Sequence, residues 1–364
     1  MNILGQNVVF GVGERFNLWS LITENYRKNV LVLASKRMLD SGKISEFLPM
    51  GEVQAIAVAS CEPTLSMVQK IREAVGEKKI SAVIAIGGGS VIDCGKLCAI
   101  YLEPSNRNYS LQDIFYGKVE LNPRKNILFA ALPTTAGTGA EVTNNAVIID
   151  EETAIKKSIR HDTMIPDFPL IDPELTYDCP KRIVAASGLD SLTQAIECCI
   201  SKKTTPETRK LASEAFLTVF NNLEKAYNGD LNAKNQLAYA TMQGGIAFKI
   251  GGLGSVHGLA HPIGSLRHIA HGEACGILLE HILKINIKFV DSLAGELGWE
   301  SGSKLISDIV ELRNKLGVGD NFRDYNFTEK DFAFIAENCR SGSMSCNPVP
   351  MSDEDIFSLL KRIC

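Results

Sequence analysis

Residues 80–102 are ISAVIAIGGGSVIDCGKLCAIYL, and this stretch predicts how the first half of the chain folds. It begins with a nearly continuous apolar run, continues with Gly87, Gly88, Gly89 and Ser90, and ends in a second apolar segment of helical length. Strands that are apolar on both faces are typical of parallel sheets covered by helices on both sides. We therefore expect a buried parallel strand, a tight glycine turn and a helix.

The glycine turn predicts an anion-binding site. Glycines let the backbone approach a phosphate, and a helix N-terminus offers unpaired N–H groups and a partial positive charge. The turn matches neither G-x-G-x-x-G nor a P-loop, so a plain tight turn is the alternative for this stretch alone. Asp93 is expected either to cap the start of the helix or to reach a ribose hydroxyl.

The same alternation of apolar runs and helical segments continues on both sides of this stretch. Residues 29–34, 53–58 and 126–132 are expected strands, and residues 64–75 have helical periodicity. This order indicates an α/β domain with a parallel sheet. A second loop at residues 133–143, PTTAGTGAEVT, also follows a strand. Two such loops at the carboxyl ends of parallel strands favour a dinucleotide site over a local turn rich in glycine and threonine.

The pattern changes near residues 178–180, where Asp178, Cys179 and Pro180 interrupt it. A chain of 364 residues is also longer than one hydrophobic core usually supports. We therefore predict a Rossmann-like nucleotide-binding α/β domain at residues 1–179 and an all-helical domain at residues 180–364. The segments with helical spacing in the second domain are residues 187–201, 206–226, 233–249, 275–297 and 302–316.

The composition excludes several classes of protein. Hydrophobic content of 45% and charged content of 22% indicate an ordinary globular protein. A net charge of −4 does not indicate the basic surface of a nucleic-acid-binding protein. The first residues do not resemble a signal peptide, and we expect no segment with the about 20 apolar residues of a membrane span. Ten cysteines without a C-x-x-C pair predict reduced thiols in a cytoplasmic protein rather than a disulfide framework.

Residues 251–281, GGLGSVHGLAHPIGSLRHIAHGEACGILLEH, contain five of the six histidines. His257 and His261 are four residues apart, so both imidazoles lie on one face if the segment is helical. Histidine is the commonest metal ligand and a general acid or base near neutral pH. The alternative is a buried helix whose histidines are hydrogen-bonded within the core.

Asp190 and Gln194 are also four residues apart and would present a carboxylate and an amide on one helical face. With His257 and His271 they make a possible set of two oxygen and two nitrogen donors. Such a set suits zinc or ferrous iron and leaves room for a substrate oxygen.

Four motifs occur in order along the chain: GGGSVIDCGK, PTTAGTGAEVTN, GLDSLTQAIE and AFKIGGLGSVHGLAHPIGSLRHIAHGE. Together they resemble the iron-containing (group III) alcohol dehydrogenases, and the resemblance runs from VVFGVG near the start to NPVPMSDEDI near the end. It implies the fold of this family and of dehydroquinate synthase, with the active site between the two domains. It also implies a homodimer that uses NAD(P)(H) and one divalent metal, Fe2+ or Zn2+.

The resemblance implies roles for individual residues. Asp190, His257 and His271 match metal ligands, His261 matches a histidine that relays protons, and Phe248 matches an aromatic residue of the substrate pocket. The positions that match the cofactor site are Gly88, Gly89, Ser90, Asp93, Thr134, Thr135, Thr138, Asn145, Lys156 and Ile183.

Two departures from the family concern the metal and the cofactor. Gln194 stands where the fourth ligand is usually histidine, which favours zinc, a three-ligand site or a metal-free variant. Ser35, followed by Lys36 and Arg37, stands where NAD-preferring relatives carry an aspartate. Serine with two cations tolerates a 2′-phosphate, so we expect NADP(H) to be accepted.

A third departure concerns the substrate. Lys249 and Arg267 stand where uncharged residues are commoner, so we expect a small substrate with an anionic group, such as succinic semialdehyde. A desolvated cation needs a partner, and a carboxylate on the substrate would supply it. The alternative is that both side chains point outward or pair with Glu141 or Glu273.

The expected function is that of an NAD(P)-dependent alcohol dehydrogenase or aldehyde reductase acting on a small primary alcohol and its aldehyde. A lyase similar to dehydroquinate synthase would need basic and carboxylate groups that clamp a phosphorylated sugar acid, and this pattern is not found. A metal-free nucleotide-binding protein is the third possibility, and only Gln194 motivates it.

Overall fold

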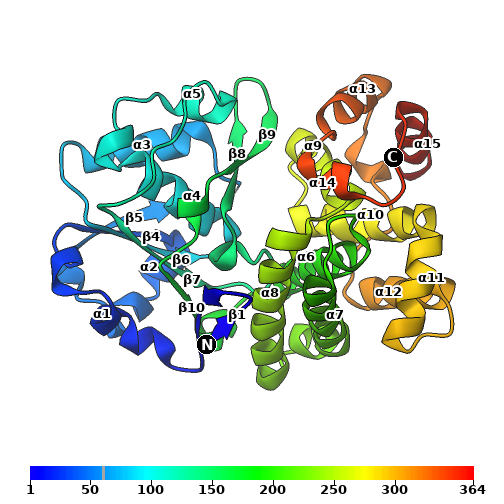
Figure 1. Cartoon of the computed structure of the whole chain (residues 1–364), viewed down its shortest axis with the longest axis horizontal. Helices are drawn as coiled ribbons and strands as arrows, with labels where there is room; N and C mark the ends of the chain where they lie inside the picture. The colour runs from blue at the N-terminus through cyan, green and yellow to red at the C-terminus, as the bar shows by residue number, and fades with distance from the viewer. Residues whose placement is uncertain (60–61) are drawn as a thin grey trace. The chain divides into compact units, whose positions relative to one another are not determined.

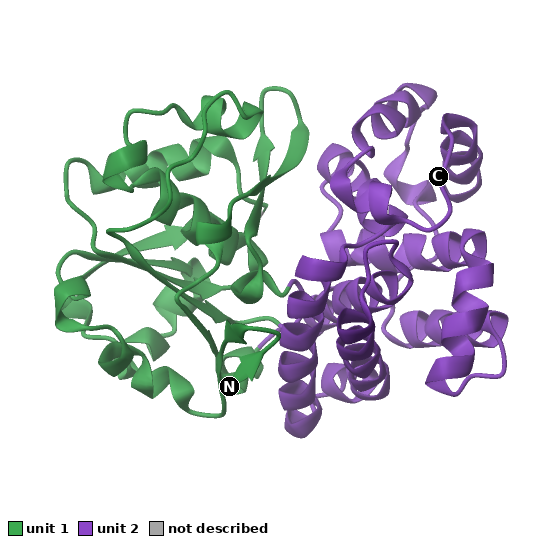
Figure 2. Ribbon diagram, in the orientation of Figure 1, with its two compact units in different colours: residues 1–135, 139–178 green, residues 136–138, 179–364 purple. Residues whose placement is uncertain are grey.

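The computed structural model of the protein describes residues 1–59 and 62–364. The chain forms two compact units, each with its own hydrophobic core (Figure 2). Unit 1 consists of residues 1–135 and 139–178, and unit 2 of residues 136–138 and 179–364. All nine cysteines in the described ranges are free thiols, as predicted from the sequence. Cys61 lies outside the described residues.

Unit 1 is built on a parallel sheet whose strands lie in the order β3-β10-β7-β6-β4-β5. The strands are β3 (Val9–Phe10), β4 (Val30–Ser35), β5 (Val53–Val58), β6 (Ala82–Gly87), β7 (Leu128–Pro133) and β10 (Phe168–Ile171). The strands expected at residues 29–34, 53–58, 80–86 and 126–132 are confirmed to within two residues at each end. β6 and β7 are buried along their whole length, which explains their continuous apolar sequence.

Helices cover both faces of this sheet (Figure 1). Val83 and Ala85 of β6 pack on one face, while Ile84 and Ile86 pack on the other, because successive side chains of a strand alternate. The first face is covered by α3 (Leu65–Val75), α4 (Gly89–Tyr101) and α5 (Leu111–Tyr116), and the second by α1 (Leu18–Leu21) and α2 (Lys36–Asp40).

Two antiparallel hairpins complete unit 1. They are β1 (Asn2–Ile3) with β2 (Gln6–Asn7), and β8 (Asn145–Asp150) with β9 (Ile155–Arg160). Ala146 and Ile148 of β8 belong to the same apolar cluster as the buried face of α4, so this second hairpin packs on the sheet domain.

The regular secondary structure in the described residues of unit 2 is helical, without strands. Its helices are α6 (Lys181–Ile200), α7 (Pro206–Tyr227), α8 (Leu231–Gly251), α9 (Ser255–Arg267), α10 (His271–Ile285), α11 (Ile287–Leu297), α12 (Gly302–Lys315), α13 (Glu329–Asn338), α14 (Gly342–Cys346) and α15 (Asp353–Ile363). The expectation of one helical segment at 275–297 is wrong, because the chain divides at Asn286. This buried side chain exchanges hydrogen bonds with the amide of Asn347, at 3.0 and 3.1 Å.

α6 is the central helix of unit 2. Within the described chain it is the one helix long and apolar enough to cross a membrane by length and composition, which the sequence analysis did not expect. Its most apolar window is 89% buried inside the structure, so α6 is a core helix of this unit. Its buried polar side chains include Asp190, Gln194 and Glu197, and these need partners inside the protein.

Candidate functional site

Three helices of unit 2 bring Asp190, His257 and His271 together. Asp190 lies in the middle of α6, His257 in the first turn of α9, and His271 at the start of α10. Nε2 of His257 lies 3.2 Å from Oδ1 of Asp190, and Nε2 of His271 lies 3.9 Å from the same oxygen. Two imidazole nitrogens and one carboxylate oxygen at such spacings match the donors and approximate geometry of a zinc or iron site.

The thiol of Cys275 is a fourth donor at this place, and the sequence analysis missed it. Cys275 lies one turn after His271 on α10, and its Sγ is 3.7 Å from Nε2 of that histidine. The donor atoms of Asp190, His257, His271 and Cys275 all lie within 4.8 Å of one another. The spacing of four residues between His271 and Cys275 was the available indication, since it places both side chains on one helical face.

Glu197 holds the ring of His257 in place. Its carboxylate is buried and accepts hydrogen bonds from Nδ1 of His257 at 2.7 Å and from the backbone N–H groups of Gly254 and Val256 at 2.9 and 2.7 Å. α9 has no side-chain cap of its own, so this carboxylate also satisfies the first N–H groups of the helix. This bond turns the ring so that Nε2 faces Asp190. Carboxylates commonly orient metal-binding histidines in this way, through the ring nitrogen that does not bind the metal.

The charges at this place favour a cation. Burial alone would lower the pKa of His257, but the hydrogen bonds with Asp190 and Glu197 outweigh burial and raise its pKa to about 9. The side chains of Asp190 and Glu197 are only 4% and 1% exposed. Buried carboxylates are costly unless positive charge or hydrogen bonds compensate them, so the donors present fit a divalent cation.

Gly272 allows α10 to approach α6 this closely. A Cβ atom at Gly272 would lie 1.9 Å from the carbonyl oxygen of Ala186 and 3.1 Å from Cβ of Asp190. No side chain fits at these distances. The position of His271 beside Asp190 therefore depends on a glycine at the next residue.

Gln194 also lies on this face of α6, one turn after Asp190, and is buried. Its Nε2 donates a 3.4 Å hydrogen bond to the carbonyl oxygen of Thr138, while its Oε1 has no hydrogen-bond partner within the described ranges. The amide therefore contacts residues 136–138, which belong to unit 2. Its predicted role as a metal ligand stays a prediction.

His261 lies one turn after His257, and its ring centroid is 5.1 Å from that of His271. It is partly exposed. Three of the five histidines of residues 251–281 therefore gather at one place. The other two do not, because His268 is exposed at the end of α9 and His281 lies ten residues beyond His271 on α10.

The starts of the two loops of the predicted nucleotide site lie next to each other in unit 1. Gly87 at the end of β6 pairs with Pro133 at the end of β7. Gly88 is the N-cap of α4, and a Cβ atom there would lie 3.4 Å from Oγ1 of Thr135. The expected convergence of the loops is confirmed. Backbone N–H groups of Gly89 and Ser90 lie in the first turn of α4, where an anion can accept their hydrogen bonds.

Asp93 does not cap α4, so that alternative is wrong. It lies in the second turn, and its Oδ2 accepts a 3.0 Å hydrogen bond from the backbone N–H of Val147 in β8. Burial raises the pKa of Asp93, and nearby Lys96 partly opposes this rise. Lys96 is fully buried and donates a 2.6 Å hydrogen bond to the carbonyl oxygen of Asn145. Two side chains of α4 therefore position the hairpin that carries Asn145.

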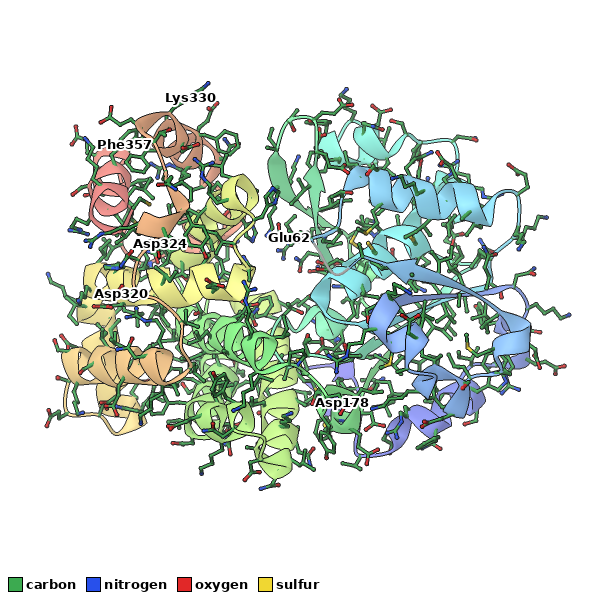
Figure 3. All side chains as sticks on the ribbon, turned by 180° about the vertical axis from the view of Figure 1, so that it is seen from behind. Glu62, Asp178, Asp320, Asp324, Lys330 and Phe357 are labelled. Atoms are coloured by element: carbon green, nitrogen blue, oxygen red, sulfur yellow. The ribbon has the colours of Figure 1, made fainter. Side chains whose placement is uncertain are left out.

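Three other predicted cofactor residues have different surroundings. Lys156 on β9 forms an ion pair with Glu62, which is labelled in Figure 3. Thr134 donates its backbone N–H to the carbonyl oxygen of Gly87 at 2.9 Å. Ile183 is exposed in the first turn of α6. Their roles toward a cofactor stay predictions.

The structure accounts for Ser35, Lys36 and Arg37 without a phosphate. Ser35 is the N-cap of α2, and its Oγ accepts a 3.3 Å hydrogen bond from the N–H of Met38. Lys36 forms an exposed 2.8 Å ion pair with Asp40. Arg37 donates to the backbone carbonyl of Asp178, whose position Figure 3 labels. Both cations expected beside a 2′-phosphate thus already have acceptors.

Arg267 has several partners inside unit 2. Its Nη2 lies 2.5 Å from Oδ2 of Asp331, its Nε donates a 3.0 Å hydrogen bond to the carbonyl oxygen of Tyr325, and its guanidinium stacks over Phe327. The alternative partners, Glu141 and Glu273, are not those observed. Its contact with an anionic group of the substrate stays a prediction.

The other two predicted substrate residues lie at the end of α8. Phe248 is partly buried and packs against the core of unit 2, and Lys249 is partly exposed beside it. Their contact with a substrate stays a prediction.

Two family models together match nearly the whole chain. "Iron-containing alcohol dehydrogenase" matches residues 5–173, and "Fe-containing alcohol dehydrogenase family, C-terminal" matches residues 184–364. The chain belongs to the iron-containing alcohol dehydrogenase family. This confirms the resemblance, the fold class of an α/β unit followed by a helical unit, and the enzyme class, an NAD(P)-dependent and metal-dependent alcohol dehydrogenase.

The chain is similar to several known proteins over most or all of its length. The chain is 32% identical to an NADPH-dependent butanol dehydrogenase of Clostridium saccharobutylicum over 90% of this chain and 87% of the relative. It is 30% identical to a 4-hydroxybutyrate dehydrogenase of Clostridium kluyveri over 83% of this chain and 84% of the relative. The solved sulfoacetaldehyde reductase of Bifidobacterium kashiwanohense in complex with NAD+ matches with a TM-score of 0.90 at 28% identity, covering 100% of this chain and 98% of that one.

Proposed function

We propose that this dehydrogenase interconverts a small primary alcohol and its aldehyde with NAD(P)(H) and one divalent cation held by Asp190, His257 and His271. The convergence of these three donors supports the proposal, because two imidazole nitrogens lie 3.2 and 3.9 Å from one carboxylate oxygen. Ferrous iron and zinc both accept such donors. A homodimer in the cytoplasm is part of the same proposal.

A bound cation supplies a Lewis acid that polarises the substrate oxygen, and the nicotinamide supplies or accepts the hydride. The residues of this chain orient and shield the site. Glu197 fixes the ring of His257, and the side chains of Asp190 and His257 are each only 4% exposed. The side chain of His271 is 23% exposed, so solvent and substrate reach the donors from its side.

His261 is proposed to move the proton that accompanies hydride transfer. Its ring lies beside that of His271 and is partly exposed, so it can pass a proton between the substrate hydroxyl and solvent. We expect His261→Ala to keep its metal while kcat falls, with partial recovery when imidazole is added. Loss of the metal in this variant would instead make His261 a ligand.

The cofactor is proposed to bind along the GGGS turn and the loop after β7. The backbone N–H groups at the start of α4 would hold the pyrophosphate, and Ser35 would lie near the 2′ position of the ribose. NADP(H) use is supported by the absence of an acidic side chain at residues 35–37. Ser35→Asp should shift the ratio of kcat/KM values toward NADH, and a strong NADH preference of the unmodified enzyme would contradict the proposal.

The substrate is proposed to carry an anionic group. The names of two relatives, a 4-hydroxybutyrate dehydrogenase and a sulfoacetaldehyde reductase, support this chemistry. Lys249 and Arg267 are the proposed cationic partners, and Arg267 also pairs with Asp331. Succinic semialdehyde should be reduced with a higher kcat/KM than butanal, and Lys249→Ala should remove the difference. Equal values in the unmodified enzyme would refute the anionic preference and leave the dehydrogenase function intact.

The function as a whole is tested by metal analysis of the purified protein together with a panel of aldehydes and both reduced cofactors. We expect one divalent cation per chain, turnover that a chelator abolishes, and recovery when Zn2+ or Fe2+ is returned. Activity that survives complete removal of the metal would overturn the proposal.

A further inference from the structure

We infer that Cys275 is a metal ligand and takes the coordination position that the family usually fills from residue 194. This rests on the proposed function insofar as unit 2 binds a divalent cation. The inference names the fourth protein donor and thereby the kind of metal.

The positions of the four donor atoms carry the inference. In a tetrahedral zinc site, metal–nitrogen bonds of about 2.0 Å and metal–sulfur bonds of about 2.3 Å place neighbouring donors roughly 3.3–3.6 Å apart. Here three donor pairs are separated by 3.2, 3.9 and 3.7 Å: His257 with Asp190, His271 with Asp190, and Cys275 with His271. All pairs of the four donor atoms lie within 4.8 Å. Small movements of the side chains, without a change of rotamer, would therefore bring them to coordination distance.

The packing of α10 on α6 explains why the thiol faces this site. Gly272 and Gly276 are one turn apart on α10, and Cβ atoms there would lie 1.9 Å from Ala186 and 2.8 Å from Leu189. Both glycines bring the backbone of α10 onto α6. Cys275 lies between them in sequence and is fully buried, on the helical turn that follows His271.

Gln194 is the weaker candidate for the same coordination position. Its Nε2 donates to the carbonyl oxygen of Thr138, so Oε1 is the atom that could reach a metal. Its Oε1 is a neutral donor, whereas a thiolate brings a negative charge and a soft sulfur atom.

A thiolate ligand also affects which metal is favoured. When Cys275 binds a divalent cation, the cation replaces the thiol proton, which passes to the solvent. Sulfur together with imidazole favours zinc over ferrous iron, so we expect zinc to bind more tightly than iron.

Cobalt(II) substitution tests the inference without relying on activity. Cobalt bound to a thiolate has a sulfur-to-metal charge-transfer band in the near ultraviolet, which oxygen and nitrogen donors do not produce. Metal-free protein is titrated with CoCl2 for the unmodified chain, Cys275→Ala, Gln194→Ala and Cys364→Ser. Zinc affinities are measured for the same proteins by competition with a chromophoric chelator, and far-ultraviolet circular dichroism checks folding.

We expect the band in the unmodified protein, Gln194→Ala and Cys364→Ser, and its absence in Cys275→Ala. Zinc affinity should fall by more than about 100-fold in Cys275→Ala, which exceeds the loss expected for a residue that only supports a ligand. In Gln194→Ala it should fall by only a few-fold. One bound cobalt without the band, or a band that survives in Cys275→Ala, would overturn the inference while leaving the metal-dependent function intact. A protein that takes up no cobalt or zinc would overturn both.

Discussion

The contact between α10 and α6 at Gly272 leads to a strong prediction about metal binding. In Gly272→Ala the new Cβ would lie 2.6 Å from the carbonyl carbon of Ala186, whereas carbon atoms in contact are separated by about 3.5 Å. The start of α10 must therefore move by about 1 Å, and His271 is the neighbouring residue. Metal sites tolerate about 0.2 Å of error in their ligand distances, so the shift is several times too large.

We expect Gly272→Ala to bind a divalent metal at least about 10–100-fold more weakly. A loss of this size is typical when a residue that holds a metal ligand in place is replaced. Overpacking should also lower its free energy of unfolding by about 1–3 kcal/mol. Gly295→Ala in α11 is the matched control, because a Cβ atom there meets nothing within 4 Å. The control should keep its metal and gain about 0.5–1 kcal/mol of stability. The amount of metal bound per chain is measured by plasma mass spectrometry after dialysis against increasing concentrations of a chelator. If Gly272→Ala kept as much metal as the unmodified protein, the reasoning would be refuted.

Two further predictions concern buried carboxylates. Glu197→Gln should lower zinc affinity by about 10–100-fold, because an amide cannot accept hydrogen bonds from all three donors around it. Zinc affinity is measured by competition with a chelator, and an unchanged value would contradict the role given to Glu197. Burial raises the pKa of Glu141 from 4.5 to about 7 although Lys96 opposes the rise. A folded-state pKa above the unfolded one gives stability that is present below pH 4.5 and is lost as pH rises toward 7. Urea unfolding should therefore show a loss of up to about 3 kcal/mol between pH 5 and 8 that is absent from Glu141→Gln, and the same loss in both proteins would show that another group causes it.

The sheet of unit 1 could be predicted because its strands bury both faces. β6 and β7 are fully buried, so their sequences carry no polar residues that would blur the pattern. The division of α10 from α11 could not be predicted in this way. It depends on Asn286 and its bonds to Asn347, which is 61 residues away in sequence and whose position only the folded chain decides.

The candidate metal site was predictable where spacing along one helix decides it. Asp190, His257 and His271 follow from residue type and spacing, and the family resemblance points to the same three residues. The partner of Arg267 was not predictable, since Asp331 lies 64 residues away on another helix. Glu197 was missed for a similar reason, because a single carboxylate in the apolar sequence AIECCI acquires its role only when α9 starts beside it.

Cys275 shows why a departure from a family pattern has to be judged in three dimensions. Along the sequence, glutamine at residue 194 removes an imidazole and favours weak metal binding or none. In the fold, α10 packs on α6 through Gly272, and the thiol of Cys275 reaches the same group of donors from the other helix. A sulfur donor in place of a nitrogen donor changes the metal that binds best and leaves the number of protein donors the same. The same substitution at residue 194 therefore predicts loss of metal when it is considered alone, and a preference for zinc when it is considered together with Cys275.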